Sequence, residues 1–184
     1  MIVMNHESIP RRTSADTQGD VARVLSKLES SGQDLTVLRI LANAPAVFRP
    51  YLKFASALIY EGALDPVVRE VVILWMAKAR PNTYEWAEHD VIGERSGVPR
   101  ELIEYLETGA PLDDRFTEDA RCAVALADEL LATGAIAPDN FSAAHDRFGL
   151  EALIELLLTI SWWGGAVPIL LEALDLDLPD NLRE

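Results

Sequence analysis

The sequence predicts an all-α fold, and three observations lead to that prediction. Apolar residues recur every three or four positions along most of the chain, which is the spacing of one face of a helix. Proline, glycine and capping residues interrupt this pattern at intervals typical of globular helices. No segment shows the alternation of apolar and polar residues that a half-buried strand requires. A chain of 184 residues that is 49% hydrophobic can also bury a substantial core.

The first helices are defined by their breaks. One begins near Asp16, carries apolar residues at helical spacing and ends at Gly32. A short helix precedes the break at Asn43 and Pro45, and the helix after that is expected to kink or restart at Pro50. The complete set of expected ranges is about 16–30, 35–42, 46–60, 66–79, 83–96, 100–107, 118–133, 138–148 and 150–173.

Capping residues and glycines set the limits of the later helices. Asp65 and Pro66 form a favourable N-cap and N1 pair, and Pro81 stops the helix that they open. Thr117 caps the helix that begins at about residue 118, and Gly149 separates the last two expected helices.

Residues 156–171 form an uncharged stretch that resembles a membrane span in composition. The stretch is shorter than the roughly 20 residues needed to cross a bilayer, and glycines and Pro168 interrupt it, so we expect a buried helix. Because this helix is apolar nearly all round, we expect another subunit to cover part of it. Trp162 and Trp163 are expected in the core, with a subunit interface or a pocket wall as the alternatives.

Composition limits the classes of partner. The chain has 16 basic and 30 acidic residues, a net charge of −14, which disfavours binding to nucleic acid or to an anionic membrane. A single cysteine excludes an intrachain disulfide and fits a reducing cytoplasm, and the first residues lack the features of a signal peptide. Residues 1–16 are expected to form a loose arm, and residues 17–184 a single helical domain.

The candidate site lies at one helix-to-helix junction. Glu70 lies on or near the apolar side of its helix, where a buried carboxylate needs a partner, and Arg69 is not expected to turn back to it. Asn82 can cap the next helix, which puts Glu85 and His89 four residues apart on one face. Two simpler interpretations stay open at this point. Glu85 fits the spacing of a capping box with Asn82, and His89 fits a structural histidine.

This junction resembles the carboxymuconolactone decarboxylase and alkylhydroperoxidase D superfamily. The peroxidase branch has the pattern Glu-x(11)-Cys-x-x-Cys-x-x-x-His, which falls without a gap on Glu70, Asn82, Glu85 and His89. The sequence Tyr-Glu-Trp-x-x-His, which ends at His89, resembles the non-peroxidase branch. Further similarity lies at 64–70 and 97–103. The resemblance implies an alkylhydroperoxidase D-like helical bundle, a single oligomeric domain that forms a trimer or hexamer.

The resemblance also implies chemistry without thiols. The only cysteine is Cys122, far from the junction, whereas a dithiol peroxidase needs one thiolate to attack the peroxide and a second thiol to resolve the product. The implied activity is acid–base decarboxylation of a small lactone or carboxylic acid, as in aromatic-compound catabolism. His89 would act as the general acid, Glu85 would orient it, and Glu70 would complete a proton relay through Tyr84 or a water.

The substrate itself would contact residues near the same junction, and neither a cofactor nor a metal is expected. The expected substrate-binding residues are Asn82, Tyr84, Trp86 and Arg80. Two other functions stay open. One is a non-catalytic or small-molecule-binding helical oligomer of the same family, and the other is a redox protein that uses Cys122 as a lone thiol.

Overall fold

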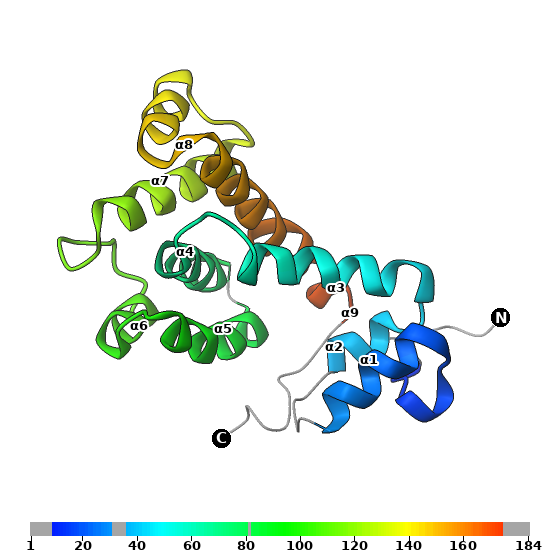
Figure 1. Ribbon diagram of the computed structural model, residues 1–184. Coiled ribbons are helices and arrows are strands. Elements are labelled where there is room, and N and C mark those ends of the chain that lie inside the picture. Colours follow the sequence, from blue (N-terminus) through cyan, green and yellow to red (C-terminus); the bar gives the residue numbers. More distant parts are fainter. Residues whose placement is uncertain (1–8, 31–35, 81, 175–184) are drawn as a thin grey trace. The chain divides into compact units, whose positions relative to one another are not determined.

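The computed structural model describes residues 9–30, 36–80 and 82–174, and all regular structure in this part is helical (Figure 1). The all-α prediction is therefore confirmed for the described residues. The predictions for residues 1–8, for Gly32 and for Pro81 lie outside them. The elements are η2 (Ser14–Asp16, a 3₁₀ turn), α1 (Gly19–Ser30), α2 (Thr36–Leu41), α3 (Pro45–Tyr60), α4 (Pro66–Ala79), α5 (Thr83–Ser96), α6 (Arg100–Glu107), α7 (Glu118–Thr133), α8 (Pro138–Ser161), η3 (Trp162–Ala166, a π-helical turn) and α9 (Val167–Leu174).

The observed helix limits differ from the predicted ones at the start of α1 and at Pro50. The first helix begins at Gly19, because the preceding residues form the separate turn η2, where the backbone N–H of Thr13 donates to Asp16 Oδ1 over 2.9 Å. The helix α3 runs through Pro50 without a restart. Gly149 separates two helical segments within α8, as predicted, since its φ of 73° and ψ of 169° are non-helical and the helix kinks there.

The described residues form two compact units. One consists of the described residues up to Ala57 together with those from Leu171 onward, and the other is Leu58–Leu170. The boundary predicted after residue 16 stays a prediction.

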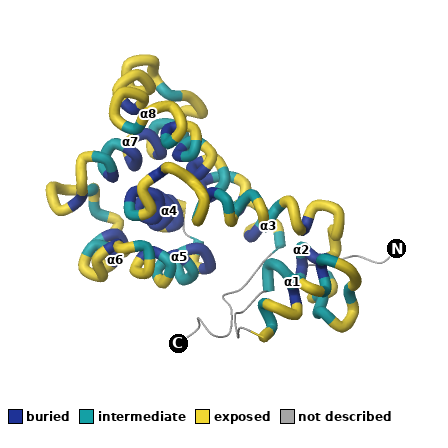
Figure 2. Tube along the Cα trace, viewed as in Figure 1, coloured by how far each residue is buried: buried dark blue, intermediate teal, exposed yellow. Residues whose placement is uncertain are grey.

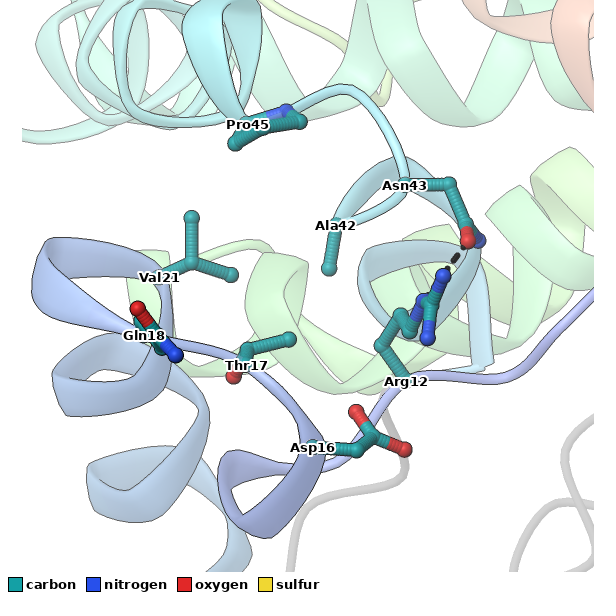
Figure 3. A pocket seen from close by; sticks show the side chains of 8 residues that line it. All are labelled: Arg12, Asp16, Thr17, Gln18, Val21, Ala42, Asn43 and Pro45. Carbon is teal, nitrogen blue, oxygen red and sulfur yellow. Dashed lines mark hydrogen bonds between the residues drawn. The ribbon is translucent and has the colours of Figure 1, made fainter.

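The first unit has its own small core and a pocket. Four buried residues form the core, with partly buried apolar side chains around them: Val21, Leu25, Ala42 and Phe48. A pocket of about 350 Å³ lies beside this core, and Figure 3 shows the side chains that line it. There Arg12 Nε donates a hydrogen bond to Asn43 Oδ1 over 2.8 Å, which ties the segment before η2 to the end of α2.

The second unit is built around α4. This helix packs against α5, α6, α7, α8 and η3, and Figure 2 shows it as the most continuously buried element of the unit. Because neighbours surround it, α4 buries residues on every side rather than on one stripe. The buried residues are Val68, Arg69, Glu70, Val71, Val72, Ile73, Leu74, Met76 and Ala77. Two adjacent charged residues, Arg69 and Glu70, are therefore both taken out of water.

One described stretch, Pro138–Leu174, is long and apolar enough to cross a membrane by length and composition. Within its most apolar window, 39% of the residues are buried inside the protein, and Leu153, Leu156 and Ile160 are fully buried. The kink at Gly149 and the π-helical turn η3 also interrupt it. These features are those of a helix that contributes to a protein core.

The N-cap of the central helix provides a test of this arrangement. Asp65 Oδ1 accepts hydrogen bonds from the backbone N–H groups of Val67 and Val68, over 2.9 and 3.0 Å. We expect Asp65→Ala to lower the free energy of unfolding by about 1 kcal/mol, because two backbone donors lose their acceptor. Asp65→Asn keeps an acceptor and should lose less. Urea denaturation of the three proteins measures the difference, and equal midpoints would contradict the capping role.

Candidate functional site

The site lies between α4 and α5, which pack against each other. Asn82 caps α5, since its Oδ1 accepts from the backbone N–H of Glu85 over 3.1 Å. The backbone N–H of Asn82 donates to the carbonyl of Ala77 over 3.0 Å. That N–H group is therefore already used, and the reciprocal bond of a capping box does not occupy the side chain of Glu85. The cap sets the start of α5, and the helix then carries Glu85 and His89 towards α4.

Glu70 is at the centre of the cluster. Its side chain is completely buried, with both carboxylate oxygens in use. Arg69 Nε donates to Oε1 over 2.8 Å, and Nδ1 of His89 lies 2.7 Å from Oε2. The expectation that Arg69 would not turn back to Glu70 is wrong. Residue Arg69 is only 4% exposed, because α4 is buried along most of its length, and its side chain turns to the adjacent carboxylate.

His89 lies between two carboxylates. Its Nδ1 faces Glu70, and its Nε2 lies 3.6 Å from Oε2 of Glu85, beyond hydrogen-bond distance but within reach of an ion pair. Only 2% of His89 and 6% of Glu85 are exposed. Glu70 accepts the Nδ1–H bond and so fixes the ring, which leaves Nε2 as the nitrogen that faces Glu85.

The environment shifts the pKa values of the two carboxylates in opposite directions. Burial raises the pKa of Glu70, but the hydrogen bond and charge of His89, followed by those of Arg69, outweigh it and keep the pKa below its usual value. For Glu85, burial dominates and raises the pKa from 4.5 to about 7, although the charge of His89 and a hydrogen bond from Trp163 oppose it. Glu85 therefore exchanges a proton near neutral pH, while Glu70 stays ionised.

The pKa of His89 is raised. Burial lowers it, but the hydrogen bond and charge of Glu70, with further contributions from Glu85 and Glu88, more than compensate. The imidazole therefore favours the protonated form, in which both ring nitrogens carry hydrogen. Such a group can donate a proton from Nε2 while Glu70 stabilises the remaining charge.

Sequence reasoning had not placed Trp163 in this cluster. Trp163 comes from η3, is 5% exposed, and its ring meets the ring of His89 edge-on, with centroids 5.5 Å apart and planes at 84°. The only signal in the sequence was the pair Trp162 and Trp163 in the uncharged stretch 156–171. It did not indicate which helix these side chains would pack against.

The predicted substrate-binding residues lie around the same junction. Tyr84 is buried and Trp86 half-buried on the first turn of α5, and Asn82 is its half-buried cap. Arg80 is exposed at the end of α4 and its Nη1 donates to the carbonyl of Gly164 over 3.0 Å. Their contact with a substrate stays a prediction.

The residues of this cluster do not form a recognisable metal centre. Within residues 9–30, 36–80 and 82–174, no group of three or more histidine, cysteine, aspartate or glutamate side chains has a geometry suited to a metal ion. Glu70 already uses both oxygens on Arg69 and His89.

Cys122 lies elsewhere in the same unit, in α7. It is partly exposed, and burial raises the pKa of its thiol. A raised pKa reduces the thiolate fraction at neutral pH, which is the opposite of what a reactive cysteine needs.

The pKa of Glu85 leads to a prediction about stability. Because the folded protein holds this proton more tightly than the unfolded chain, the stability of the wild type should fall as pH rises from about 4.5 to about 7. The total loss from this group is on the order of 3 kcal/mol. Glu85→Gln lacks the titrating group, so its stability relative to the wild type should increase across that range and level off above it.

Urea denaturation at several pH values measures this difference. Glu94→Gln removes an exposed carboxylate from the same helix and should follow the wild-type curve. Parallel curves for Glu85→Gln and the wild type would show that Glu85 does not titrate in this range.

Comparisons with known proteins place the chain by its fold. No family model and no curated protein matches the sequence. Among solved structures, an uncharacterised peroxidase-related protein from Ralstonia eutropha JMP134, described as an alkylhydroperoxidase AhpD core, superimposes with a TM-score of 0.77 at 18% identity, covering 94% of this chain and 92% of that one. An uncharacterised peroxidase-related protein from Silicibacter sp. TM1040 gives a TM-score of 0.75 at 16% identity, covering 95% and 94%. The chain thus has the alkylhydroperoxidase D-like all-α fold that the junction motif had implied.

Proposed function

We propose that this protein is an acid–base enzyme of the carboxymuconolactone decarboxylase type, acting on a small lactone or carboxylic acid. The observation that carries the proposal is the pair formed by Glu85 and Nε2 of His89. Both side chains are buried and lie 3.6 Å apart, and burial raises the pKa of Glu85 to about 7. A proton donor with a pKa close to the working pH is the most effective kind of general acid.

The geometry supports a division of roles that differs from the sequence-based expectation. Glu70, rather than Glu85, makes the short bond to the imidazole and so orients it. Glu85 faces the other ring nitrogen, Nε2, and the ring of Trp163 packs edge-on against the imidazole. In the proposed mechanism His89 and Glu85 together deliver the proton, and Glu70 with Arg69 stabilises the positive charge on the ring.

The proposed reaction proceeds in two steps that balance in atoms and charge. The bond between the substrate carbon and its carboxylate breaks, carbon dioxide leaves, and the electron pair passes into the conjugated carbonyl to form an enolate. The enolate carbon then takes the proton held by the His89–Glu85 pair, and solvent replaces that proton after product release. Burial strengthens the attraction between the imidazolium and the developing enolate charge.

The substrate's own negative charge requires a cationic group near the pair. Arg69 is already paired with Glu70. Among the residues expected to bind the substrate, the remaining arginine is Arg80, at the end of α4. Asn82, Tyr84 and Trp86 on the first turn of α5 are proposed to complete the substrate contacts. Because the protein has a net charge of −14, an anionic substrate has to be attracted by a local cation of this kind.

The structural neighbours are described as peroxidase-related, but a dithiol mechanism is not proposed for this chain. The resemblance puts the two catalytic thiols at Asn82 and Glu85, and neither side chain can be oxidised and reduced in that way. Cys122 is the only thiol, with a raised pKa. A lone-thiol redox role is therefore disfavoured as well.

A second function is favoured by one observation, the low exposure of the cluster. Glu70, Glu85 and His89 are all less than 7% exposed, as expected for a buried polar network that only stabilises the fold. In that case the protein would be a non-catalytic or small-molecule-binding helical oligomer, and His89→Ala would change stability alone.

The decisive measurement is the release of carbon dioxide from carboxymuconolactone and a panel of related lactones and carboxylic acids. We expect wild-type turnover to fall as pH rises above about 7, because the donor pair loses its proton. Glu85→Gln and His89→Ala should each lower kcat by at least about a hundredfold, the usual contribution of a general acid. Cys122→Ser and Glu94→Gln should leave kcat unchanged.

Several outcomes would reject the proposal. Absence of turnover across the panel would remove the decarboxylase assignment, and full activity in His89→Ala would favour the non-catalytic alternative. Loss of activity in Cys122→Ser alone would redirect attention to the thiol.

We also propose that the protein is a cytoplasmic homo-oligomer, a trimer or hexamer as the resemblance implies. An apolar stripe on α8 supports this proposal, since Leu150, Ile154 and Leu158 lie one turn apart and are 61%, 45% and 40% exposed. A soluble monomer would gain little from such a stripe, and a second copy of the chain would remove it from water.

Light scattering after size exclusion tests the stripe. We expect Ile154→Glu to reduce the molar mass towards that of the monomer, because a charge would be buried in the interface. Glu151→Gln, next to the stripe and exposed, should keep the wild-type mass. An unchanged mass for Ile154→Glu, or a monomeric wild type, would contradict the proposed interface.

A further inference from the structure

Thr159 is buried in the last part of α8 without a hydrogen-bond partner. Its side chain is 0% exposed, and no donor or acceptor of the described residues bonds to its Oγ1. A hydroxyl that is taken out of water without a partner destabilises the fold. Buried polar atoms of native proteins are almost always paired, so this hydroxyl requires an explanation.

Thr159 also leaves an acceptor in its own helix unused. A threonine inside a helix can donate to the backbone carbonyl four residues back, here that of Glu155. Ser161, in the same helix, makes such a bond, since its Oγ donates to the carbonyl of Leu157 over 2.8 Å. Thr159 does not. Its hydroxyl is therefore available to a group from outside the helix.

The described residues hold one other buried side-chain atom without a partner, Nε of Arg121. The guanidinium of Arg121 is nevertheless paired, because its Nη1 donates to Oδ1 of Asp114 over 3.0 Å. Thr159 has a single polar group, and all of its hydrogen-bonding capacity is unused.

Two contacts show how the end of α8 runs past α4. Just before α4, the backbone N–H of Leu64 donates to Oε2 of Glu155 over 2.7 Å. Near the end of α4, a Cβ atom added to Gly164 would lie 2.8 Å from Sδ of Met76. The segment between Glu155 and Gly164 therefore lies beside α4 and runs in the same direction.

Thr159 lies near the middle of this segment, four residues after the first contact and five before the second. It is therefore roughly level with residues 69–71, which are midway between the two contacts on the α4 side. Arg69 precedes Met76 by seven residues, or about two turns, so both lie on the side of α4 that faces the end of α8.

The face of α8 that carries Thr159 continues to the cluster. Trp163 follows Thr159 by four residues, about one turn, and its ring meets that of His89 edge-on. On the α4 side, Arg69 uses Nε for its bond to Glu70, and the N–H groups of its two Nη atoms lie outside that bond. The unpaired hydroxyl thus lies near a buried cation and near the proton-transfer cluster.

We propose that Thr159 is a substrate-binding residue, whose hydroxyl donates to a carbonyl or carboxylate oxygen of a small lactone acid. Its role rests on the proposed function, from which the substrate class is taken. The free protein buries the hydroxyl at a loss of stability, and the substrate supplies the missing acceptor. A site with such a donor rejects a ligand that lacks the acceptor.

Thr159→Val removes the hydroxyl and keeps the branched shape of the side chain. Without ligand, we expect its urea denaturation midpoint to be at least as high as that of the wild type, because no hydrogen bond is lost. Thr133→Val is the matched control, since Oγ1 of Thr133 donates to the carbonyl of Glu129 over 2.8 Å, and its midpoint should be lower. A lower midpoint in Thr159→Val would show that the hydroxyl has a partner in the folded protein and would overturn the proposal.

Paraconic acid, a saturated lactone with one carboxylate, is a suitable probe of binding, because it offers acceptor oxygens but forms no enolate by losing carbon dioxide. Titration calorimetry should give a dissociation constant for Thr159→Val that is at least about tenfold higher than for the wild type, the effect of losing one hydrogen bond. Thr159→Ser keeps a hydroxyl and should bind nearly as tightly as the wild type, and Thr133→Val should bind equally. No binding to the wild type, or an unchanged dissociation constant for Thr159→Val, would overturn the proposal.

Two outcomes separate the role of Thr159 from the proposed function. Weaker binding of paraconic acid by Thr159→Val, without any turnover of carboxymuconolactone, would support the binding role and count against the decarboxylase function alone. Turnover of carboxymuconolactone by the wild type, with an unchanged KM in Thr159→Val, would support the decarboxylase function and overturn the binding role.

Discussion

The neutralisation of Glu70 is the constraint on which the second unit depends. A carboxylate that is completely excluded from water costs several kcal/mol unless it is paired and fully hydrogen bonded. Arg69 and His89 supply one bond to each oxygen, and one of these partners comes from α4 itself while the other comes from α5. The α5 partner can reach Glu70 only if α5 starts at the correct residue, which the Asn82 cap ensures. The buried ion pair thus depends on a local capping bond.

The same arrangement makes two similar carboxylates chemically different. Glu70 has two cationic partners and stays ionised, whereas Glu85 has one at a longer distance and is governed by burial. When the environment shifts the pKa values of two acids apart in this way, the difference is commonly used to assign acid and base roles in active sites. At this junction, which resembles a thiol-containing motif in a peroxidase branch, the position of the second thiol is held by a carboxylate that titrates near neutral pH. The fold can therefore support proton transfer where a related motif supports redox chemistry.

Local signals in the sequence were sufficient to predict the helices and part of the site. Asp65, Thr117 and Asn82 each cap the helix that they were expected to cap, and the spacing of Glu85 and His89 brought them to one face. The errors came from tertiary context. Arg69 was not expected to turn back to Glu70, but both residues are buried in α4, where the guanidinium pairs with the adjacent carboxylate. Trp163 could not be placed, because its position depends on a π-helical turn and on the packing of Gly164 against Met76, which no periodic pattern encodes.

The wide turn at Trp162–Ala166 also makes the length of this segment critical. The wide turn holds one residue more than an α-helical turn, so losing a single residue there would let an ordinary α-helix form while the helices on either side kept nearly their present orientation. Only the side chains within the turn would be redirected, and the indole that meets the imidazole is one of them. In a regular helix the loss of one residue turns one side by about 100° relative to the other, but at this position it would act on the surroundings of His89 alone.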